Sequence, residues 1–122
     1  MKRDMDLVRR LLLYLEDNLD YEPLRSEEIH IEGYSDAQIG YHLQIMTDGG
    51  LIDIIDTNCM GSTVFTCFVR GMTWSGHEFL DSVKSETTWN GVKVALKPVG
   101  SASLAVITSI ATSLVKQQLG LP

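Results

Sequence analysis

The chain has 122 residues, which is enough for one well-packed domain and too few for two. It is 44% hydrophobic and 21% charged, which excludes a disordered protein, and its net charge of -6 opposes binding to the phosphate backbone of nucleic acids. Two cysteines, Cys59 and Cys67, are too few for a disulfide framework or a zinc site, and the N-terminal residues lack the apolar core of a secretory signal. We therefore expect a reduced protein of the cytoplasm.

The first quarter of the chain predicts a helix, a linker and a short strand. Over residues 3–18, apolar residues recur at helical spacing and predict an amphipathic helix. A proline within residues 20–25 indicates a linker. Apolar and polar residues alternate over residues 29–32, which predicts a short strand with Ile29 and Ile31 facing the core.

A second helix is predicted over residues 36–48. Ser35 is suited to the N-cap position, and Asp36 follows it in the first turn. Gly49 and Gly50 should end the helix, because glycine accepts the left-handed conformation after a helix. The predicted buried residues of this helix are Ile39, Leu43 and Met46.

A β-hairpin is predicted directly after this helix. Residues 51–55 and 63–70 are rich in apolar, β-branched and aromatic residues, which favour strands, and the turn-rich residues 56–62 connect them. Cys67 alternates with large apolar neighbours in the second strand and is expected to be a small core residue. Cys59 falls in the connection, and no base is placed to activate either thiol for catalysis.

Three more helices are predicted after the hairpin, over residues 74–84, 88–97 and 102–119. Trp74 and Trp89 are the largest side chains and are expected in the core, with Trp74 packed over the hairpin. The predicted N-caps of these helices are Thr73, then Thr87 or Thr88, and Ser101.

This order of elements predicts an α+β fold with the plan of a winged-helix domain. Residues 1–97 would form that domain, and residues 98–122 a C-terminal helical extension for packing or oligomerisation. The helix at 36–48 takes the place of the recognition helix, and the connection at 56–62 that of the wing. Only residues 24–28 remain for the helix that normally precedes a recognition helix, so that helix is expected to be shortened or absent.

Four ordered blocks, which together span nearly the whole chain, resemble an uncharacterised bacterial and prophage family, a domain of unknown function. The blocks are MKRDMDLVRRLLLYLE, IEGYSDAQIGYHLQIMTDGGLID, VRGMTWSGHEFLDSVKSETTWNGVK and GSASLAVITSIATSLVKQQLGL. The segment MTWSGHEFL is also similar to the LTxxGxxFL step that follows the wing in many winged-helix regulators. The resemblance implies a small winged-helix-like protein of bacterial or phage origin, and it implies no activity. The chain departs from the family in its tail, where Lys116 is the one charged residue after Lys97.

The predicted recognition helix and wing carry no cation to hold DNA. Residues 26–69 contain no Lys or Arg, whereas DNA-binding faces are held to phosphates mainly by these residues. Gln38, Tyr41 and Gln44 are the candidates for contacts with bases or with a partner protein. The acidic residues of the segment are Glu27, Glu28, Glu32, Asp36, Asp48, Asp53 and Asp56. We therefore expect this face to bind a protein rather than DNA.

No motif of catalysis, metal binding or nucleotide binding is present. His30, His42 and His77 fall on three different elements, without the spacing of a metal site. His42 and His77 are expected to be half-buried, hydrogen-bonded packing residues near Trp74. The sequence therefore predicts no enzyme, no metal and no cofactor.

The last predicted helix is the most informative segment, because residues 98–115 carry no charge. Its apolar stripe consists of Leu104, Ile107, Ala111, Leu114 and Val115. Three interpretations compete: packing against the first helix of the same domain, self-association through close approach of small residues, and contact with a membrane. Pro98, Gly100 and the many Ser and Thr argue against the membrane.

The sequence thus predicts a non-catalytic interaction protein, with an unidentified protein partner, that self-associates through its last helix, most simply as a dimer. The alternative is a winged-helix transcriptional regulator that presents basic residues on an unusual face. Local ion pairs such as Asp6 with Arg10 would favour the interaction protein, and a basic patch on one surface would favour the regulator. A more distant alternative is an inhibitor whose carboxylates imitate DNA.

Overall fold

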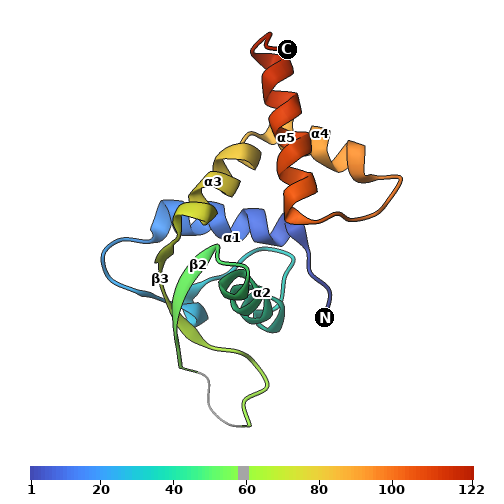
Figure 1. The fold of residues 1–122 in the computed structure, drawn as a ribbon. Coiled ribbons are helices and arrows are strands. Elements are labelled where there is room, and N and C mark those ends of the chain that lie inside the picture. Colours follow the sequence, from blue (N-terminus) through green and yellow to red (C-terminus); the bar gives the residue numbers. More distant parts are fainter. Residues whose placement is uncertain (58–60) are drawn as a thin grey trace. The chain divides into compact units, whose positions relative to one another are not determined.

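The computed structural model describes residues 1–57 and 61–122, and its ribbon is drawn in Figure 1. The chain divides into two compact units, Met1–His77 and Glu78–Pro122. The predicted domain boundary between Lys97 and Pro98 falls within the second unit. In the described residues there are five α-helices, one 3-10 helix and a three-stranded antiparallel sheet. The predicted α+β class is confirmed.

The first unit begins with helix α1 (Met5–Asn18). Asp4 caps it, because its carboxylate accepts hydrogen bonds from the amides of Asp6 and Leu7. The apolar stripe of α1 is buried and contacts α2 (Asp36–Asp48) and the sheet. The core of the unit is formed mainly by Leu7, Val8, Leu11, Leu12, Leu15, Ile39, Leu43, Met46, Leu51, Ile52 and Val69.

Helix α2 has the bounds and the cap that the sequence predicts. Ser35 and Gln38 form a reciprocal capping box, in which each side chain accepts a hydrogen bond from the backbone amide of the other. The helix ends at Asp48 with Gly49 as its C-cap, and Gly50 adopts a left-handed φ of 76° that lets the chain turn directly into the sheet.

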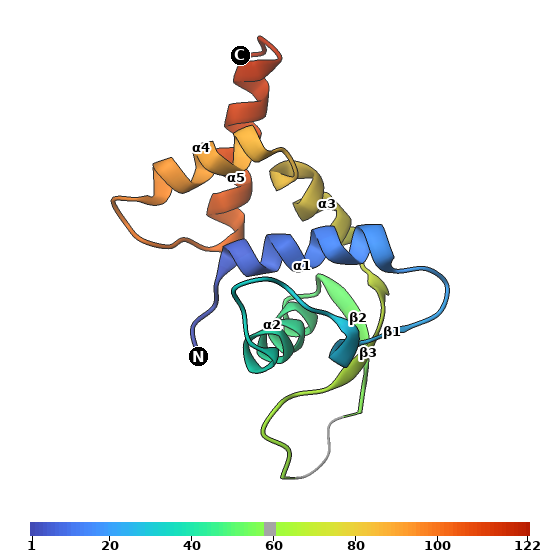
Figure 2. The same cartoon turned by 180° about the vertical axis from the view of Figure 1, so that it is seen from behind.

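The sheet consists of β1 (Leu24–Arg25), β2 (Ile52–Asp56) and β3 (Cys67–Met72) in the order β1-β3-β2. Figure 2 shows α1 and α2 beside this sheet in the first unit. The prediction of a strand over residues 29–32 is wrong, because the strand between α1 and α2 is β1, which lies in the segment expected to be a linker. A pairing with β3, with Leu24 opposite Val69, makes this segment a strand.

The second hairpin strand begins later than predicted. β2 and β3 pair only as far as Asp56 and Cys67. Residues 64–66 leave the ladder and pass over α2, so they are not part of the strand predicted at 63–70. One backbone hydrogen bond continues past the end of the ladder, from the amide of Thr57 to the carbonyl of Thr66 at 3.2 Å.

Between β1 and α2 lies the single-turn 3-10 helix η1 (Ser26–Glu28). The winged-helix plan expected from the sequence has a full helix at this place, whereas the structure has only this single turn. The order α1, β1, η1, α2, β2, β3 and the central position of β3 follow the winged-helix plan. Of the predicted wing, residues 58–60 lie outside the described residues.

The helix α3 (Trp74–Val83) begins in the first unit and ends in the second. Thr73 caps it as predicted, since its hydroxyl accepts a hydrogen bond from the amide of Gly76. Trp74 was expected in the core, and that prediction is wrong, because 81% of it is exposed. The buried residues of α3 are Phe79, Leu80 and Val83.

The second unit also contains α4 (Glu86–Leu96) and α5 (Leu104–Gln118), which pack against each other. Their N-caps are Ser85 and Ser103, so the predicted caps at Thr87 or Thr88 and at Ser101 are wrong by two or three residues. Trp89 is buried as expected. No helix within the described residues is both long and apolar enough to cross a membrane.

Candidate functional site

The three polar residues predicted as contacts on α2 do not form one exposed group. Gln38 is half-buried, and its side-chain oxygen is engaged in the capping box, where it accepts a hydrogen bond from the amide of Ser35 at 2.9 Å. Tyr41 is half-buried and lies edge-on to the ring of His42, with ring centres 5.7 Å apart. Gln44 is exposed.

A cavity of about 230 Å³ opens beside α2 in the first unit. It lies between η1, the first turns of α2 and the segment of residues 64–66. It could not be found from the sequence, because residues 64–66 are far along the chain from η1 and the start of α2. Its lining residues are Ser26, Glu27, Ile29, Asp36, Ile39, Gly40, Val64, Phe65 and Thr66.

Gly40 allows residues 64–66, which form one wall of the cavity, to contact α2. A β-carbon at Gly40 would lie 2.5 Å from the carbonyl oxygen of Phe65, closer than side chains approach backbone oxygens. A glycine inside a helix is unfavourable by about 0.5–1 kcal/mol relative to alanine. This glycine is the one sequence signal that indicates a close approach to α2, and hence the position of the cavity.

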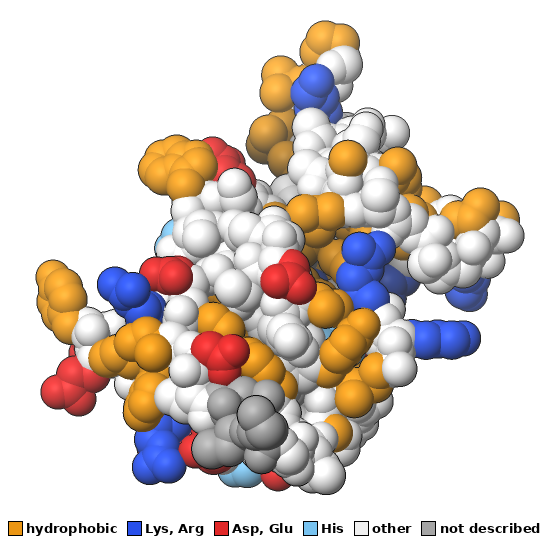
Figure 3. All heavy atoms as spheres, turned by 60° about the horizontal axis from the view of Figure 1, so that its bottom comes forward, with side chains coloured by type: hydrophobic (Ala, Val, Ile, Leu, Met, Phe, Trp, Pro, Cys, Tyr) orange, Lys and Arg blue, Asp and Glu red, His pale blue; other side chains and the backbone are white. Residues whose placement is uncertain are grey.

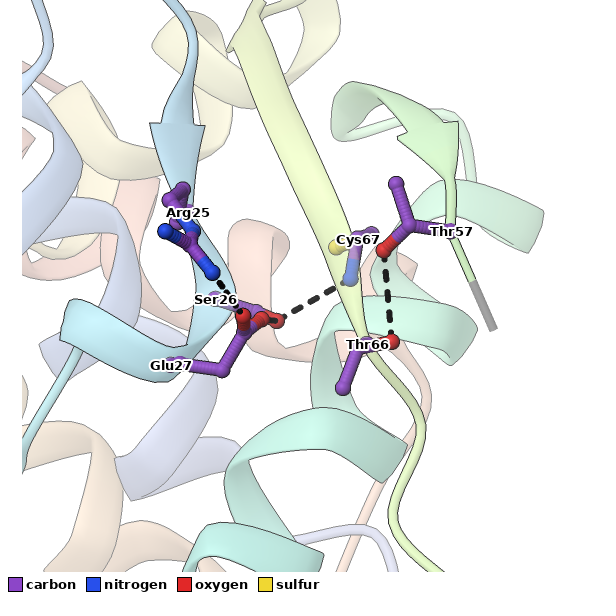
Figure 4. Close-up of polar contacts among 6 residues, drawn as sticks. All are labelled: Arg25, Ser26, Glu27, Thr57, Thr66 and Cys67. Atoms are coloured by element: carbon purple, nitrogen blue, oxygen red, sulfur yellow. Dashed lines mark hydrogen bonds and ion pairs between the residues drawn. The ribbon is translucent and has the colours of Figure 1, made fainter. Parts of the chain in front are cut away.

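Ser26, which lines the cavity, joins η1 to β3 through a hydrogen bond that Figure 4 draws. Its hydroxyl oxygen accepts a hydrogen bond from the amide of Cys67 at 3.0 Å, and the hydroxyl donates to the carboxylate of Glu27 at 2.9 Å. The guanidinium of Arg25 binds the same carboxylate at 3.0 Å. These hydrogen bonds, from Ser26 first and then from Arg25, lower the pKa of Glu27 and keep it ionised.

A second carboxylate of the cavity belongs to Asp36, at the start of α2. Its side chain is 74% exposed, and one oxygen lies 3.8 Å from Nδ1 of the equally exposed His30. Of the residues that line the cavity, none is a Lys or Arg. One of the two carboxylates at the cavity, that of Glu27, is already compensated by the guanidinium of Arg25.

His42 is hydrogen-bonded, as predicted, but it is fully buried rather than half-buried. Its Nε2 accepts a hydrogen bond from the amide of Asp4 at 2.8 Å, and its Nδ1 lies 2.7 Å from the carbonyl of Gln38. An amide only donates, so Nε2 carries no proton and Nδ1–H donates to the carbonyl. The carboxylate of Asp4 also accepts a hydrogen bond from the hydroxyl of Tyr34 at 2.9 Å. His42 therefore ties α2 to the start of α1.

The other histidines do not join this network. His77 was expected to be half-buried, and that prediction is wrong, because it is exposed on the first turn of α3. Among the described residues, no three His, Cys, Asp or Glu lie close enough together to hold a metal ion.

Cys67 is a buried core residue with a free thiol, as predicted. Burial raises the pKa of the Cys67 thiol to about 11. A thiol with so high a pKa is a poor nucleophile at neutral pH. Cys59 lies outside the described residues.

Several basic residues of the first unit are held in local ion pairs. Arg10 lies 3.1 Å from Asp6 one turn earlier on α1, which is the kind of local pair that favours the interaction protein over the regulator. Arg25 binds Glu27, and Arg70 lies 3.7 Å from Asp53 on the neighbouring strand. Figure 3 looks toward the hairpin end of the unit, where acidic and hydrophobic side chains are exposed.

The predicted apolar stripe of α5 faces inward in the second unit. Ile107 and Ala111 are buried, and the other three residues of the stripe are half-buried. Gly91 of α4 gives room to Leu114, whose Cδ1 would lie 2.8 Å from a β-carbon at Gly91. Another face of α5, carrying Ala105, Val106, Ser109 and Thr112, is exposed.

Comparison with known proteins gives one family match and one similar protein over nearly the whole chain. Residues 2–102 match the family model described as "Hypothetical protein (DUF2513)". The chain belongs to this family. It is also 31% identical over 120 residues to a protein of Haemophilus influenzae described as "Uncharacterized protein", covering 98% of this chain and 99% of that one.

The expected resemblance to an uncharacterised bacterial family is thereby confirmed. The family match includes α1 to α4 and ends before α5, whereas the Haemophilus relative covers the tail as well. No solved structure matches the chain.

Proposed function

We propose that this DUF2513 member is a non-catalytic interaction module that binds a second copy of itself through the exposed face of α5. The observation that carries the proposal is the complete lack of charge over residues 98–115, although α5 has an exposed face. Exposed helix faces in soluble proteins normally carry Lys, Glu or Arg.

The chemistry of this face suits contact between two identical helices. Ala105, Ser109 and Thr112 recur at helical spacing, and such small side chains allow two helix axes to come close. Val106 is 47% exposed beside them, and Leu119 and Leu121 are exposed just after the helix. Each copy has a net charge of -6, so an uncharged face is where two copies repel each other least.

The test is the mass of the protein in solution, measured by light scattering and by sedimentation. We expect the full chain to form a dimer and Ser109→Arg to shift it to the monomer, because a buried cation at the helix contact would be repelled by its symmetry mate. Thr87→Arg is the matched control, since it adds the same charge at an exposed position of α4. A monomeric full chain at high concentration would refute the proposal.

A point substitution is a sharper test than removal of the tail. Truncation after Lys97 would also remove Ile107, Ala111 and Leu114, which pack inside the second unit. Such a truncation is expected to lower solubility whether or not α5 binds a second copy.

The second candidate function is a winged-helix regulator that binds DNA, and the order of elements in the first unit supports it. The charge distribution opposes it, because residues 26–69 have no Lys or Arg and Arg10, Arg25 and Arg70 are paired with acids. Tight and sequence-selective binding of duplex DNA in a gel-shift assay at low salt would favour the regulator over the interaction module.

A further inference from the structure

The end of α4 exposes two cations and two valines on one surface. Lys93 and Lys97 lie one helical turn apart, and both are exposed. Val94 beside them is 64% exposed, and Val99, just after the helix, is 68% exposed. The helix dipole favours cations in the last turn of a helix, but it gives no reason for two valines to face water. Residues 93–99, the basic end of α4, therefore have the character of a contact surface.

The cations of the basic end of α4 are not neutralised within the described part of the chain. Neither Lys93 nor Lys97 forms an ion pair there. The sequence also contains no Asp or Glu after Glu86, so the rest of α4, the loop after it and α5 supply no acid. A partner that complements this surface is therefore anionic.

The first unit of the same chain carries the opposite charge in excess. Residues 16–32, the acidic segment, contain seven Asp and Glu, and Arg25 is their one Lys or Arg. Arg25 is already bound to Glu27. Glu28 and Glu32 are both exposed, and neither forms an ion pair among the described residues. Unlike the carboxylate of Glu27, these two carboxylates are free to bind the lysines of another copy.

From this complementarity we infer that the two copies of the dimer are antiparallel, with the basic end of α4 in one copy bound to the acidic segment of the other. A two-fold axis makes such a contact reciprocal, so each charge pair is formed twice. In the parallel arrangement the two acidic segments would face each other, and like charges across an interface are unfavourable. The inference rests on the proposed self-association through α5, to which it adds a second surface and the orientation of the copies.

Other anionic partners suit the basic end of α4 less well. Basic segments that bind anionic membranes carry about four to eight cations, whereas this surface has only Lys93 and Lys97. The net charge of -6 opposes the approach of nucleic acids. A second copy brings seven acidic residues in one short segment, at the concentration of the protein itself. The charge distribution therefore favours a second copy as the partner.

Two charge-reversal variants test the contact, with the Kd of the dimer measured by sedimentation at about 0.15 M salt. Lys93→Glu/Lys97→Glu should raise the Kd about tenfold, because the charge pairs of both reciprocal contacts become repulsive. Glu28→Lys/Glu32→Lys should raise the Kd by about the same factor. This second variant lowers the net charge from -6 to -2, since each substitution adds two positive charges. General repulsion alone would therefore make its dimer tighter rather than weaker.

A mixture of the two variants in equal amounts should restore the Kd of the unmodified chain to within about threefold. In a mixed dimer the reversed end of α4 meets the reversed acidic segment, and the two unmodified surfaces meet each other. Lys2→Glu/Arg3→Glu is the matched control, because it changes the net charge as much as the α4 variant does but lies at the N-terminus. This control should change the Kd less than about threefold. Circular dichroism shows whether each variant is folded.

Three results would overturn the inference. They are equal Kd values for the α4 variant and its control, a tighter dimer of Glu28→Lys/Glu32→Lys, and no recovery in the mixture. A dimer that Ser109→Arg dissociates and that both charge reversals leave unchanged would refute the antiparallel orientation and leave the contact through α5 in place. A monomeric unmodified chain would refute both proposals, so the two failures are distinguishable.

Discussion

The carbonyl oxygen of Phe65 lies 2.5 Å from the point where Gly40 would carry a β-carbon. Helix α2 and the segment that leads into β3 can therefore touch only because residue 40 is glycine. This contact also sets the width of the cavity beside α2, so the packing of the fold and the shape of the site depend on the same pair.

Gly40→Ala is expected to lower the free energy of unfolding by about 1–3 kcal/mol, the usual range for overpacking. The added methyl group must push residues 64–66 away from α2. Urea unfolding followed by far-UV circular dichroism measures the change. Gly71→Ala is the control, because a β-carbon at Gly71 would meet no atom within 4 Å, and equal losses in both variants would contradict the explanation.

His42→Phe is expected to lower the free energy of unfolding by about 1–3 kcal/mol, because it leaves buried hydrogen-bonding groups without a partner. The ring size is nearly kept, but the amide of Asp4 and the carbonyl of Gln38 lose their bonds to the imidazole. Hydrogen exchange should show faster exchange at the start of α1. His30→Phe, at an exposed position, should leave both measurements nearly unchanged.

The buried thiol of Cys67 predicts a loss of stability at alkaline pH. Its pKa is raised from 9.0 to about 11 by burial, so the folded state keeps the proton that the unfolded state releases. The resulting stabilisation is fully present below pH 9 and is lost as the pH rises through 11.

The measurement compares Cys59→Ser with the double variant Cys59→Ser/Cys67→Ala, by urea unfolding between pH 8 and 11. The difference in unfolding free energy between them should shrink as the pH rises. In the single variant, iodoacetamide should label Cys67 slowly at pH 8 and rapidly once urea unfolds the chain. Rapid labelling of the folded protein would show that the thiol is accessible.

Thr88→Val is expected to raise the free energy of unfolding by about 1 kcal/mol, since it removes a buried hydroxyl that lacks a partner. Among the described residues, the hydroxyl of Thr88 is the one buried side-chain polar atom without a hydrogen bond. Thr87→Val, at the exposed neighbouring position, is the control and should change stability little. Thermal unfolding measures both, and a loss of stability in Thr88→Val would contradict the prediction.

Local patterns were enough to predict that the five α-helices exist, because helical periodicity spans only a few residues, although the N-caps of α4 and α5 were misplaced by two or three residues. Ser35 with Gln38 and the stripe of Ile39, Leu43 and Met46 specify α2 completely. The strand between α1 and α2 was misplaced because the pairing of Leu24 with Val69 joins residues far apart in the sequence. Alternation of apolar and polar residues over only four positions, as in residues 29–32, determines a strand less strongly than such a pairing does.

The cavity was missed for the same reason. Its walls are η1, α2 and residues 64–66, and only the fold brings them together. The carboxylates of Glu27 and Asp36 were recognised in the sequence as part of an acidic segment. Their position at a cavity with apolar walls was not predictable from charge. Gly40, within α2, was visible in the sequence, and its structural reason is the close contact with the carbonyl oxygen of Phe65.

The two tryptophans differ in a way that affects how unfolding is observed. Trp89, in the second unit, is 3% exposed, whereas Trp74, in the first unit, is 81% exposed. Intrinsic fluorescence should therefore contain a quenchable, red-shifted component from Trp74 and a shielded, blue-shifted one from Trp89. Because Trp74 is already exposed to water, a fluorescence melting curve will report almost only the unfolding of the second unit. Unfolding of the first unit will change the fluorescence little.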